Sequence, residues 1–200
     1  MATAVNRTTL EILYSVNYPD YDPAIWIIDP DLTILETVPI KYIKLVGDVL
    51  TEMTVAEKAA VDAAELAAAK EFYISKVCWV REWKIDTGNF EYPSGSGKYL
   101  PSSTEDQARW IGWDSIGGRW SSLGMSYPFR VYSKDGTTYT DITKAGDFGD
   151  VVEALWIHIT AKFVEASGIV QTIKNASTLQ AVSDATTTYF EDVDWSSLRS

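Results

Sequence analysis

The sequence predicts an α+β fold of two β-hairpin–helix units, the second with a long amphipathic helix. Tight turns at Gly47-Asp48 and Asp135-Gly136 each separate two apolar runs, as in a β-hairpin, where glycine tolerates the positive φ of the turn. Residues 51–54 and 140–143 follow these turns and share the order threonine, acid, apolar residue, threonine. Helix-period sequence comes after each copy, so the chain uses one hairpin-to-helix device twice.

The first strands are expected close to the N-terminus. Residues 8–18 and 24–28 are apolar runs separated by a turn rich in proline and aspartate. Residues 42–46 and 49–53 flank the first glycine turn and form the first predicted hairpin.

A helix and a further strand are expected to follow this hairpin. Thr54 and Glu57 have the spacing of a capping box, which predicts a helix from there to about residue 70. That helix is very rich in alanine, so it buries little area and should pack on another helix or within a multi-chain assembly. Alternation through residues 77–85, broken by Arg81, predicts a strand in which Cys78 is a buried apolar residue.

A flexible loop divides the predicted domains. Residues 93–98 read Pro-Ser-Gly-Ser-Gly-Lys and are the expected boundary. Residues 1–92 would then form an N-terminal attachment or assembly domain, and residues 99–185 a helix–hairpin–long helix domain. Residues 186–200 are the expected polar tail, which either docks on a neighbour or stays loose.

The C-terminal domain is expected to contain a capped helix, the second hairpin and two more helices. Residues 102–104 can cap the first of these helices, and residues 129–133 and 137–142 are the strands of the hairpin. Ser177 can cap a short last helix over residues 178–184.

One apolar stripe of about seven turns defines the long helix. Asp147 is the expected N-cap, and Gly168 is the weak point of the stripe. The only histidine, His158, stands one position before a stripe residue and is read as a boundary residue. The stripe consists of Phe148, Val152, Leu155, Ile159, Phe163, Ala166, Ile169 and Ile173.

Charge and composition narrow the classes of partner. The formal net charge is −11 and the basic residues are dispersed, so the chain should repel nucleic acid and anionic membranes. No apolar run reaches the length of a membrane span, and we expect no signal peptide. A single cysteine rules out an intramolecular disulfide.

The sequence offers no catalytic or metal-binding set, so we expect neither an enzyme nor a cofactor. One histidine and one cysteine cannot supply the usual zinc ligands. Residues 95–98 lack the first glycine and the final Ser or Thr of a phosphate-binding loop. The acidic group between Asp20 and Asp31 lacks the glycine and distal glutamate of a calcium loop.

Four aromatic residues are candidates for contact with a glycan or a protein: Trp110, Trp113, Trp120 and Tyr127. Planar rings on a surface can stack on sugar faces, and aromatic residues are enriched at protein interfaces. The alternative is that these rings fill the core of the second domain.

Several segments of the second half carry a resemblance to a known family. They are residues 106–110, the hairpin beginning at Phe129, residues 141–143, His158 within the long helix, and the closing residues Ile173, Ala176 and Thr178. Together they resemble a domain of unknown function found in tailed-bacteriophage proteins, often encoded near tail-fibre genes.

The first half is similar to part of phage virion proteins. Their pattern is Lys-Tyr-aromatic-Lys, a hairpin, Glu-Met-Thr and then Glu-Lys. It matches Lys41-Tyr42, Lys44, residues 52–54 and Glu57-Lys58, whereas Ile43 stands in place of the aromatic residue.

These resemblances imply a structural component of a bacteriophage virion, in the tail or as an adaptor for tail fibres. The expected partners are other tail proteins and further copies of the chain, made in the bacterial host cytoplasm and built into the virion. Two alternatives remain open: a receptor-binding module that reads a host surface glycan, and a capsid decoration or head-fibre protein.

Overall fold

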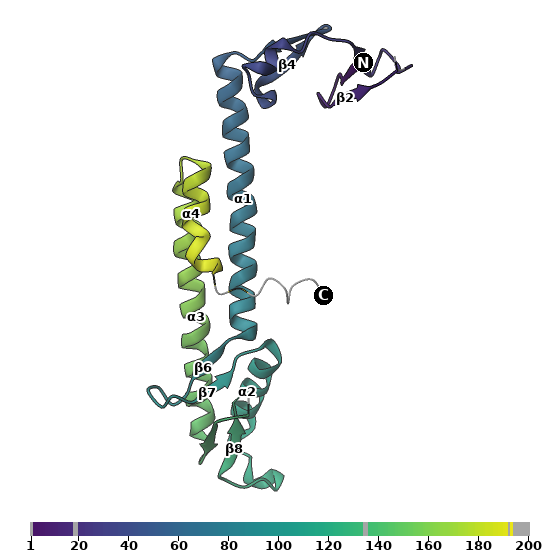
Figure 1. Cartoon of the computed structure of the whole chain (residues 1–200). Coiled ribbons are helices and arrows are strands. Elements are labelled where there is room, and N and C mark those ends of the chain that lie inside the picture. Colours follow the sequence, from purple (N-terminus) through teal and green to yellow (C-terminus); the bar gives the residue numbers. More distant parts are fainter. Residues whose placement is uncertain (1, 18–19, 134–135, 192, 194–200) are drawn as a thin grey trace. The chain divides into compact units, whose positions relative to one another are not determined.

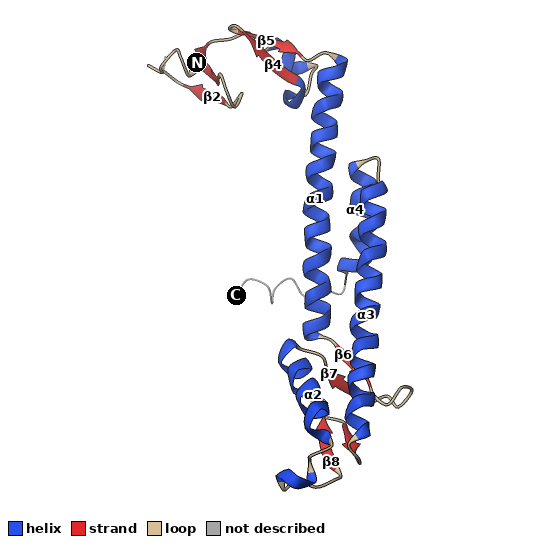
Figure 2. Ribbon diagram, turned by 180° about the vertical axis from the view of Figure 1, so that it is seen from behind, coloured by secondary structure: helices blue, strands red, loops and turns tan. Residues whose placement is uncertain are grey.

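A computed structural model describes residues 2–17, 20–133, 136–191 and 193 (Figure 1). These residues form an α+β fold, as predicted, in which long helices accompany small antiparallel sheets (Figure 2). The chain divides into two compact units, residues 1–68 and 69–200, and each is described on its own.

The first unit begins with a three-stranded antiparallel sheet. Its central strand is β1 (Ala2–Asn6), flanked by β2 (Ile12–Ser15) and β3 (Trp26–Ile28). The predicted strands at 8–18 and 24–28 correspond to β2 and β3. No strand is predicted at β1, because its small residues give a weak alternation although Ala2, Ala4 and Val5 are buried.

The predicted first hairpin is present as β4 (Ile43–Val46) and β5 (Val49–Glu52). Gly47 has φ of 63° in its turn, which is the conformation that favours glycine. Two 3₁₀ turns, η1 (Thr33–Glu36) and η2 (Ile40–Tyr42), precede it. The hairpin and the central strand share a small core of Val5, Val38, Ile43 and Leu50.

The predicted capping box joins this hairpin to α1 (Val55–Thr87). The Thr54 amide donates to Glu57 Oε2 over 2.7 Å, and the Glu57 amide donates to Thr54 Oγ1 over 3.3 Å. Lys44 of β4 places its ammonium 2.6 Å from Glu57 Oε1. The Lys44 ammonium and the two Thr54 donors lower the pKa of Glu57 to about 2, so the carboxylate ties the hairpin to the first helical turn.

The strand predicted at 77–85 is wrong, because α1 continues as one helix to Thr87. Val77, Val80 and Ile85 are its buried residues, and they lie on the side that packs within the second unit. Trp79 is 41% exposed, so large residues occupy two sides of the helix. Because large residues lie on both sides of the helix, their order in the sequence resembles the alternation of a β-strand. Cys78 is half-buried on this helix.

The predicted boundary at 93–98 is also wrong, since the two units divide between Ala68 and Ala69. Residues 93–98 instead form the loop between β6 (Asn89–Glu91) and β7 (Tyr99–Pro101), inside the second unit. The Gly97 amide donates to Glu91 Oε1 over 2.7 Å and ties this loop to its own hairpin. A glycine-rich stretch that looked like a linker is therefore a turn.

The predicted second helix and second hairpin are both present. Ser103 caps α2 (Thr104–Gly117), because its hydroxyl accepts from the Asp106 amide over 3.3 Å. After η3 (Ser121–Leu123), β8 (Phe129–Tyr132) pairs with β9 (Tyr139–Ile142). Asp135 of the predicted turn lies outside the described residues.

The two last helices begin at residues other than those predicted. Ala145 is the N-cap of α3 (Gly146–Asn175), and Asp147 accepts from the Thr143 amide over 2.7 Å from inside the first turn. Thr178, rather than Ser177, caps α4 (Leu179–Phe190) by accepting from the Ala181 amide over 3.1 Å. Residues 186–190 of the expected tail are thus helical, whereas residues 194–200 lie outside the described residues.

An aromatic-rich core holds the second unit together where α2 and the hairpins pack on α3. Alongside it, α3 and α4 run side by side in Figures 1 and 2. Lys84 of α1 lies 3.9 Å from the centre of the Tyr189 ring and 3.7 Å from Glu165 Oε1, which joins α1 to both helices. The buried core comprises Ile85, Phe90, Leu100, Trp110, Trp120, Val131, Ile142, Phe148, Val151, Leu155 and Ile159.

Replacing Gly88 with alanine should destabilise the second unit. The new Cβ would lie 2.3 Å from the Lys84 carbonyl oxygen, which is backbone and cannot move aside. We expect a loss of about 1–3 kcal/mol in the free energy of unfolding, measured by urea titration with circular dichroism. Gly112→Ala is the matched control, because nothing lies within 4 Å of its new Cβ and helix propensity favours alanine. Equal stability of the two variants would contradict the close approach at Gly88.

Glu57→Gln should reduce the acid sensitivity of the first unit. The pKa of Glu57 is lowered from 4.5 to about 2, so its stabilising effect is complete above pH 4.5 and is lost as the pH falls through 2. Urea titrations of both proteins over that pH range should show a steeper fall in stability for the wild type. Parallel pH profiles would mean that the Lys44–Glu57 pair does not stabilise the hairpin–helix junction.

Candidate functional site

The four aromatic residues predicted as contacts all lie in the core of the second unit. Trp110 and Trp120 are only 2% and 1% exposed, while Trp113 and Tyr127 are partly buried against the same cluster. The rings of Trp110 and Trp113 have centroids 5.2 Å apart, and Trp110 Nε1 donates to the Pro101 carbonyl over 3.2 Å. The structure brings these four residues together in the core. Stacking on a sugar needs an exposed ring face, so core rings do not provide such a contact.

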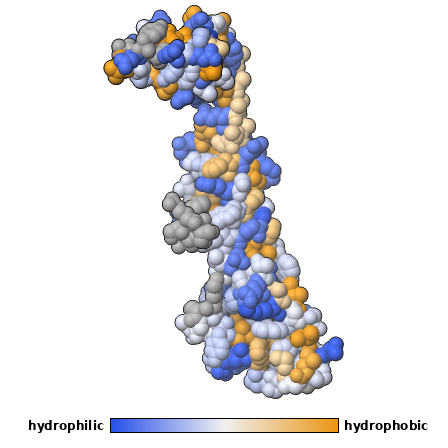
Figure 3. All heavy atoms as spheres, turned by 90° about the vertical axis from the view of Figure 1, so that its right-hand side faces the viewer, coloured by the Kyte–Doolittle hydropathy of each residue, from blue (hydrophilic) through white to orange (hydrophobic). Residues whose placement is uncertain are grey.

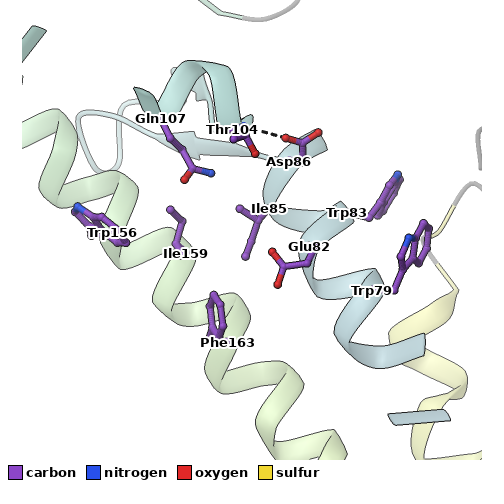
Figure 4. Close-up of a pocket in the computed structure, with 10 residues that line it drawn as sticks. All are labelled: Trp79, Glu82, Trp83, Ile85, Asp86, Thr104, Gln107, Trp156, Ile159 and Phe163. Atoms are coloured by element: carbon purple, nitrogen blue, oxygen red, sulfur yellow. Dashed lines mark hydrogen bonds between the residues drawn. The ribbon is translucent and has the colours of Figure 1, made fainter. Parts of the chain in front are cut away.

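A different set of aromatic residues lines an open groove in the second unit. Its volume is about 610 Å³, and its walls are α1, the first turn of α2, and α3 (Figure 4). Trp79, Trp156 and Phe163 remain 41%, 52% and 43% exposed there. The lining residues are Trp79, Glu82, Trp83, Ile85, Asp86, Thr104, Gln107, Trp156, Ile159 and Phe163.

Helical spacing explains why these residues meet. On α1 the residues Trp79, Glu82, Trp83 and Asp86 follow steps of three, one and three, so they lie on one side of the helix. The strand predicted for 77–85 would have put Glu82 and Trp83 on opposite faces. The wrong period therefore hides the groove in the sequence, whereas the helical spacing of these four residues is the signal that points to it.

The polar groups of the groove are held in defined positions. Asp86 Oδ1 accepts from the Thr104 amide over 2.9 Å, which fixes the end of α1 against the start of α2. Gln107 Nε2 donates to the Ser102 carbonyl over 2.9 Å. Glu82 Oε1 accepts from Arg81 Nε over 2.9 Å. The groove thus presents carboxylates and an amide beside aromatic rings.

His158 is not among the lining residues of the groove, and its Nε2 does not pair with any nucleophile that the structure describes. Its Nε2 is buried and lacks a hydrogen-bond partner among the described residues. Burial lowers the pKa of His158, and the nearby Lys162 lowers it further. The buried Ser102 hydroxyl donates to the Ile85 carbonyl over 2.7 Å, so its proton is directed at backbone and not at the imidazole. This environment fits the boundary position expected for His158.

A second surface feature lies on the solvent side of α3. Ile157, Ala161, Val164 and Gly168 are all exposed and follow steps of four, three and four, and we call them the outer seam. Ile157 is 64% exposed and Val164 is 67% exposed. This spacing is the heptad pattern by which one helix packs along another. The outer seam is distinct from the buried stripe of the same helix.

The first turns of α1 present an alanine face in the first unit. Pale orange, weakly hydrophobic surface is seen along one edge of the upper part of Figure 3. Glu57, Lys58, Asp62 and Glu65 of these turns pair with the hairpin segment, through Lys44, Glu52 and Lys41. The exposed alanines between them are Ala59, Ala60, Ala63, Ala64, Ala67 and Ala68.

The part of the chain that the structure describes contains neither a metal-binding cluster nor a membrane-spanning helix. No group of three or more His, Cys, Asp or Glu residues there is arranged to hold a metal ion. None of the helices described combines the length and the apolar character needed to cross a membrane.

Trp120→Ala and Trp156→Ala should have very different effects on stability. Trp120 is buried, so its truncation should lower the free energy of unfolding by about 3–5 kcal/mol. Trp156 is 52% exposed, and its truncation should cost less than about 1 kcal/mol. Urea titration of both variants measures the difference. Comparable losses would show that Trp156 belongs to the core and not to an accessible groove.

Comparison of the chain with protein-family models, with curated proteins and with solved structures gave no match.

Proposed function

We propose that this chain is a structural component of a bacteriophage virion that acts as an oligomer, in the tail or where tail fibres attach. The observation that carries the structural role is the outer seam of α3. It exposes two large aliphatic side chains and two small residues along a helix whose opposite stripe is already buried. The sequence resemblance to tail-associated phage proteins supports the proposed location in a virion.

The outer seam has the properties of a helix–helix interface. Burying a Val or Ile side chain fully contributes about 1.5–3 kcal/mol, so leaving both exposed forgoes a large stabilisation. Ala161 and Gly168 alternate with Ile157 and Val164, and such small residues let a second helix approach closely. Exposed apolar surface of this kind is typical of sites for protein association.

The alanine face of α1 supports the same role from the first unit. Alanine gives the helix high propensity but little area to bury, so the helix gains most when a neighbour packs closely on it. Beyond the Lys44–Glu57 pair, Lys41 holds the helix through ion pairs between exposed side chains, which contribute little individually. Contacts with neighbouring chains would add the apolar burial that this segment lacks.

The acidic character of the chain fits an exterior part of the particle. A formal net charge of −11 opposes contact with viral DNA, so a site on the outside of the virion suits it. Tail attachment and head decoration both meet this condition. Labelling the protein with antibody in imaged particles separates the two locations, and absence of the chain from purified virions by mass spectrometry would contradict either.

Ala161→Glu should dissociate the oligomer. The substitution places a charge in the middle of the outer seam, where pairing of two seams would bury it without a partner. We expect analytical ultracentrifugation to show an oligomer for the wild type and a shift to monomer for the variant. Thr188→Glu is the matched control, because it adds the same charge at an exposed position on α4 away from the seam. A wild type that stays monomeric at high concentration would overturn the proposal.

A further inference from the structure

We propose that the groove between α1, α2 and α3 is a binding site for a neutral saccharide. This site is separate from the oligomeric role, since Trp156 and Ile157 are consecutive and point about 100° apart around α3. Trp156 lines the groove, whereas Ile157 belongs to the outer seam. A chain could therefore use one face of α3 for association and the neighbouring face for a ligand.

The groove has the dimensions and the aromatic content that a saccharide requires. Its volume of about 610 Å³ lies within the usual range for small-molecule sites, which is about 300–1,000 Å³. Trp79 and Trp83 of α1 and Trp156 of α3 are all among its lining residues (Figure 4). Indole rings offer broad flat faces, against which the C–H faces of pyranose rings can pack.

Polar groups next to these rings match the hydroxyl groups of a sugar. The carboxylates of Glu82 and Asp86 accept hydrogen bonds, and the side-chain amide of Gln107 both donates and accepts. Asp86 uses Oδ1 for the Thr104 amide, which leaves its other oxygen for a ligand. Hydroxyl groups satisfy such acceptors without adding charge, so the donor–acceptor pattern fits a neutral sugar.

The charges of the groove select against two other classes of ligand. The Asp86 carboxylate would repel anionic sugars and phosphorylated compounds, whereas the charge of Glu82 is paired with Arg81. A quaternary ammonium ligand requires rings that close around one point, whereas the rings of Trp79, Trp83 and Trp156 do not converge in Figure 4. The Phe163 ring already carries the Arg81 guanidinium at 4.1 Å from its centre. A neutral saccharide is therefore the class that the lining favours.

Titration of the full chain with neutral disaccharides tests this site. The probes are chitobiose, maltose, cellobiose and lactose, with a glucuronate-containing disaccharide as the anionic comparison. Binding is followed by tryptophan fluorescence and by saturation-transfer NMR. The variants are Trp156→Ala and Glu82→Gln, and the matched control is Phe72→Ala, which removes another exposed ring of α1 that does not line the groove. Circular dichroism verifies that each variant is folded.

We expect at least one neutral disaccharide to bind the wild type and the Phe72 variant with equal affinity. Trp156→Ala and Glu82→Gln should each weaken that binding by about tenfold or more, the first through loss of stacking and the second because a charged hydrogen-bond acceptor becomes a neutral one. Absence of binding by all four neutral probes overturns the proposal. So does equal loss in the Phe72 variant, or a Trp156 variant that changes the oligomeric state, which would make the groove a protein interface. None of these results depends on whether Ala161→Glu dissociates the chain.

Discussion

The close packing at the C-terminal end of α1 is the constraint on which the second unit depends. Gly88 leaves no space for a side chain beside the Lys84 carbonyl, and this lets the chain turn directly from the helix into β6. The Ser102 hydroxyl then bonds the Ile85 carbonyl, and Asp86 receives the Thr104 amide. These backbone contacts set α2 beside α1 and so fix the width of the groove between them and α3.

Local signals in the sequence predicted much of this fold, and long-range packing accounts for what they did not predict. The capping box at Thr54, the Gly47 turn and the long apolar stripe depend on residues within a few positions of one another, so spacing alone reveals them. The course of α1 beyond residue 70 depends on partners in α3 and α4 that are distant in sequence. Those partners turn an apparent strand into a helix.

The candidate site was harder to predict than the fold, because residue type does not report exposure. Trp120 and Trp156 are the same amino acid in helical or turn-rich sequence, yet one is 1% exposed and the other 52%. Only the packing of α2 on α3 decides which ring is enclosed. The aromatic residues that we propose as contacts are therefore those of the groove, such as Trp156, and not those of the core, such as Trp120.

Gly168 illustrates a conflict between the stability of one chain and its capacity to assemble. Open space surrounds the position, so alanine would fit there and strengthen the isolated helix by about 1 kcal/mol. A methyl group at this position would also project from the outer seam, so the backbone of a second helix could not approach as closely. A protein engineered solely for thermal resistance would accept that alanine. In the association that we propose, such a variant would be the more stable monomer but would pack less closely on a second chain.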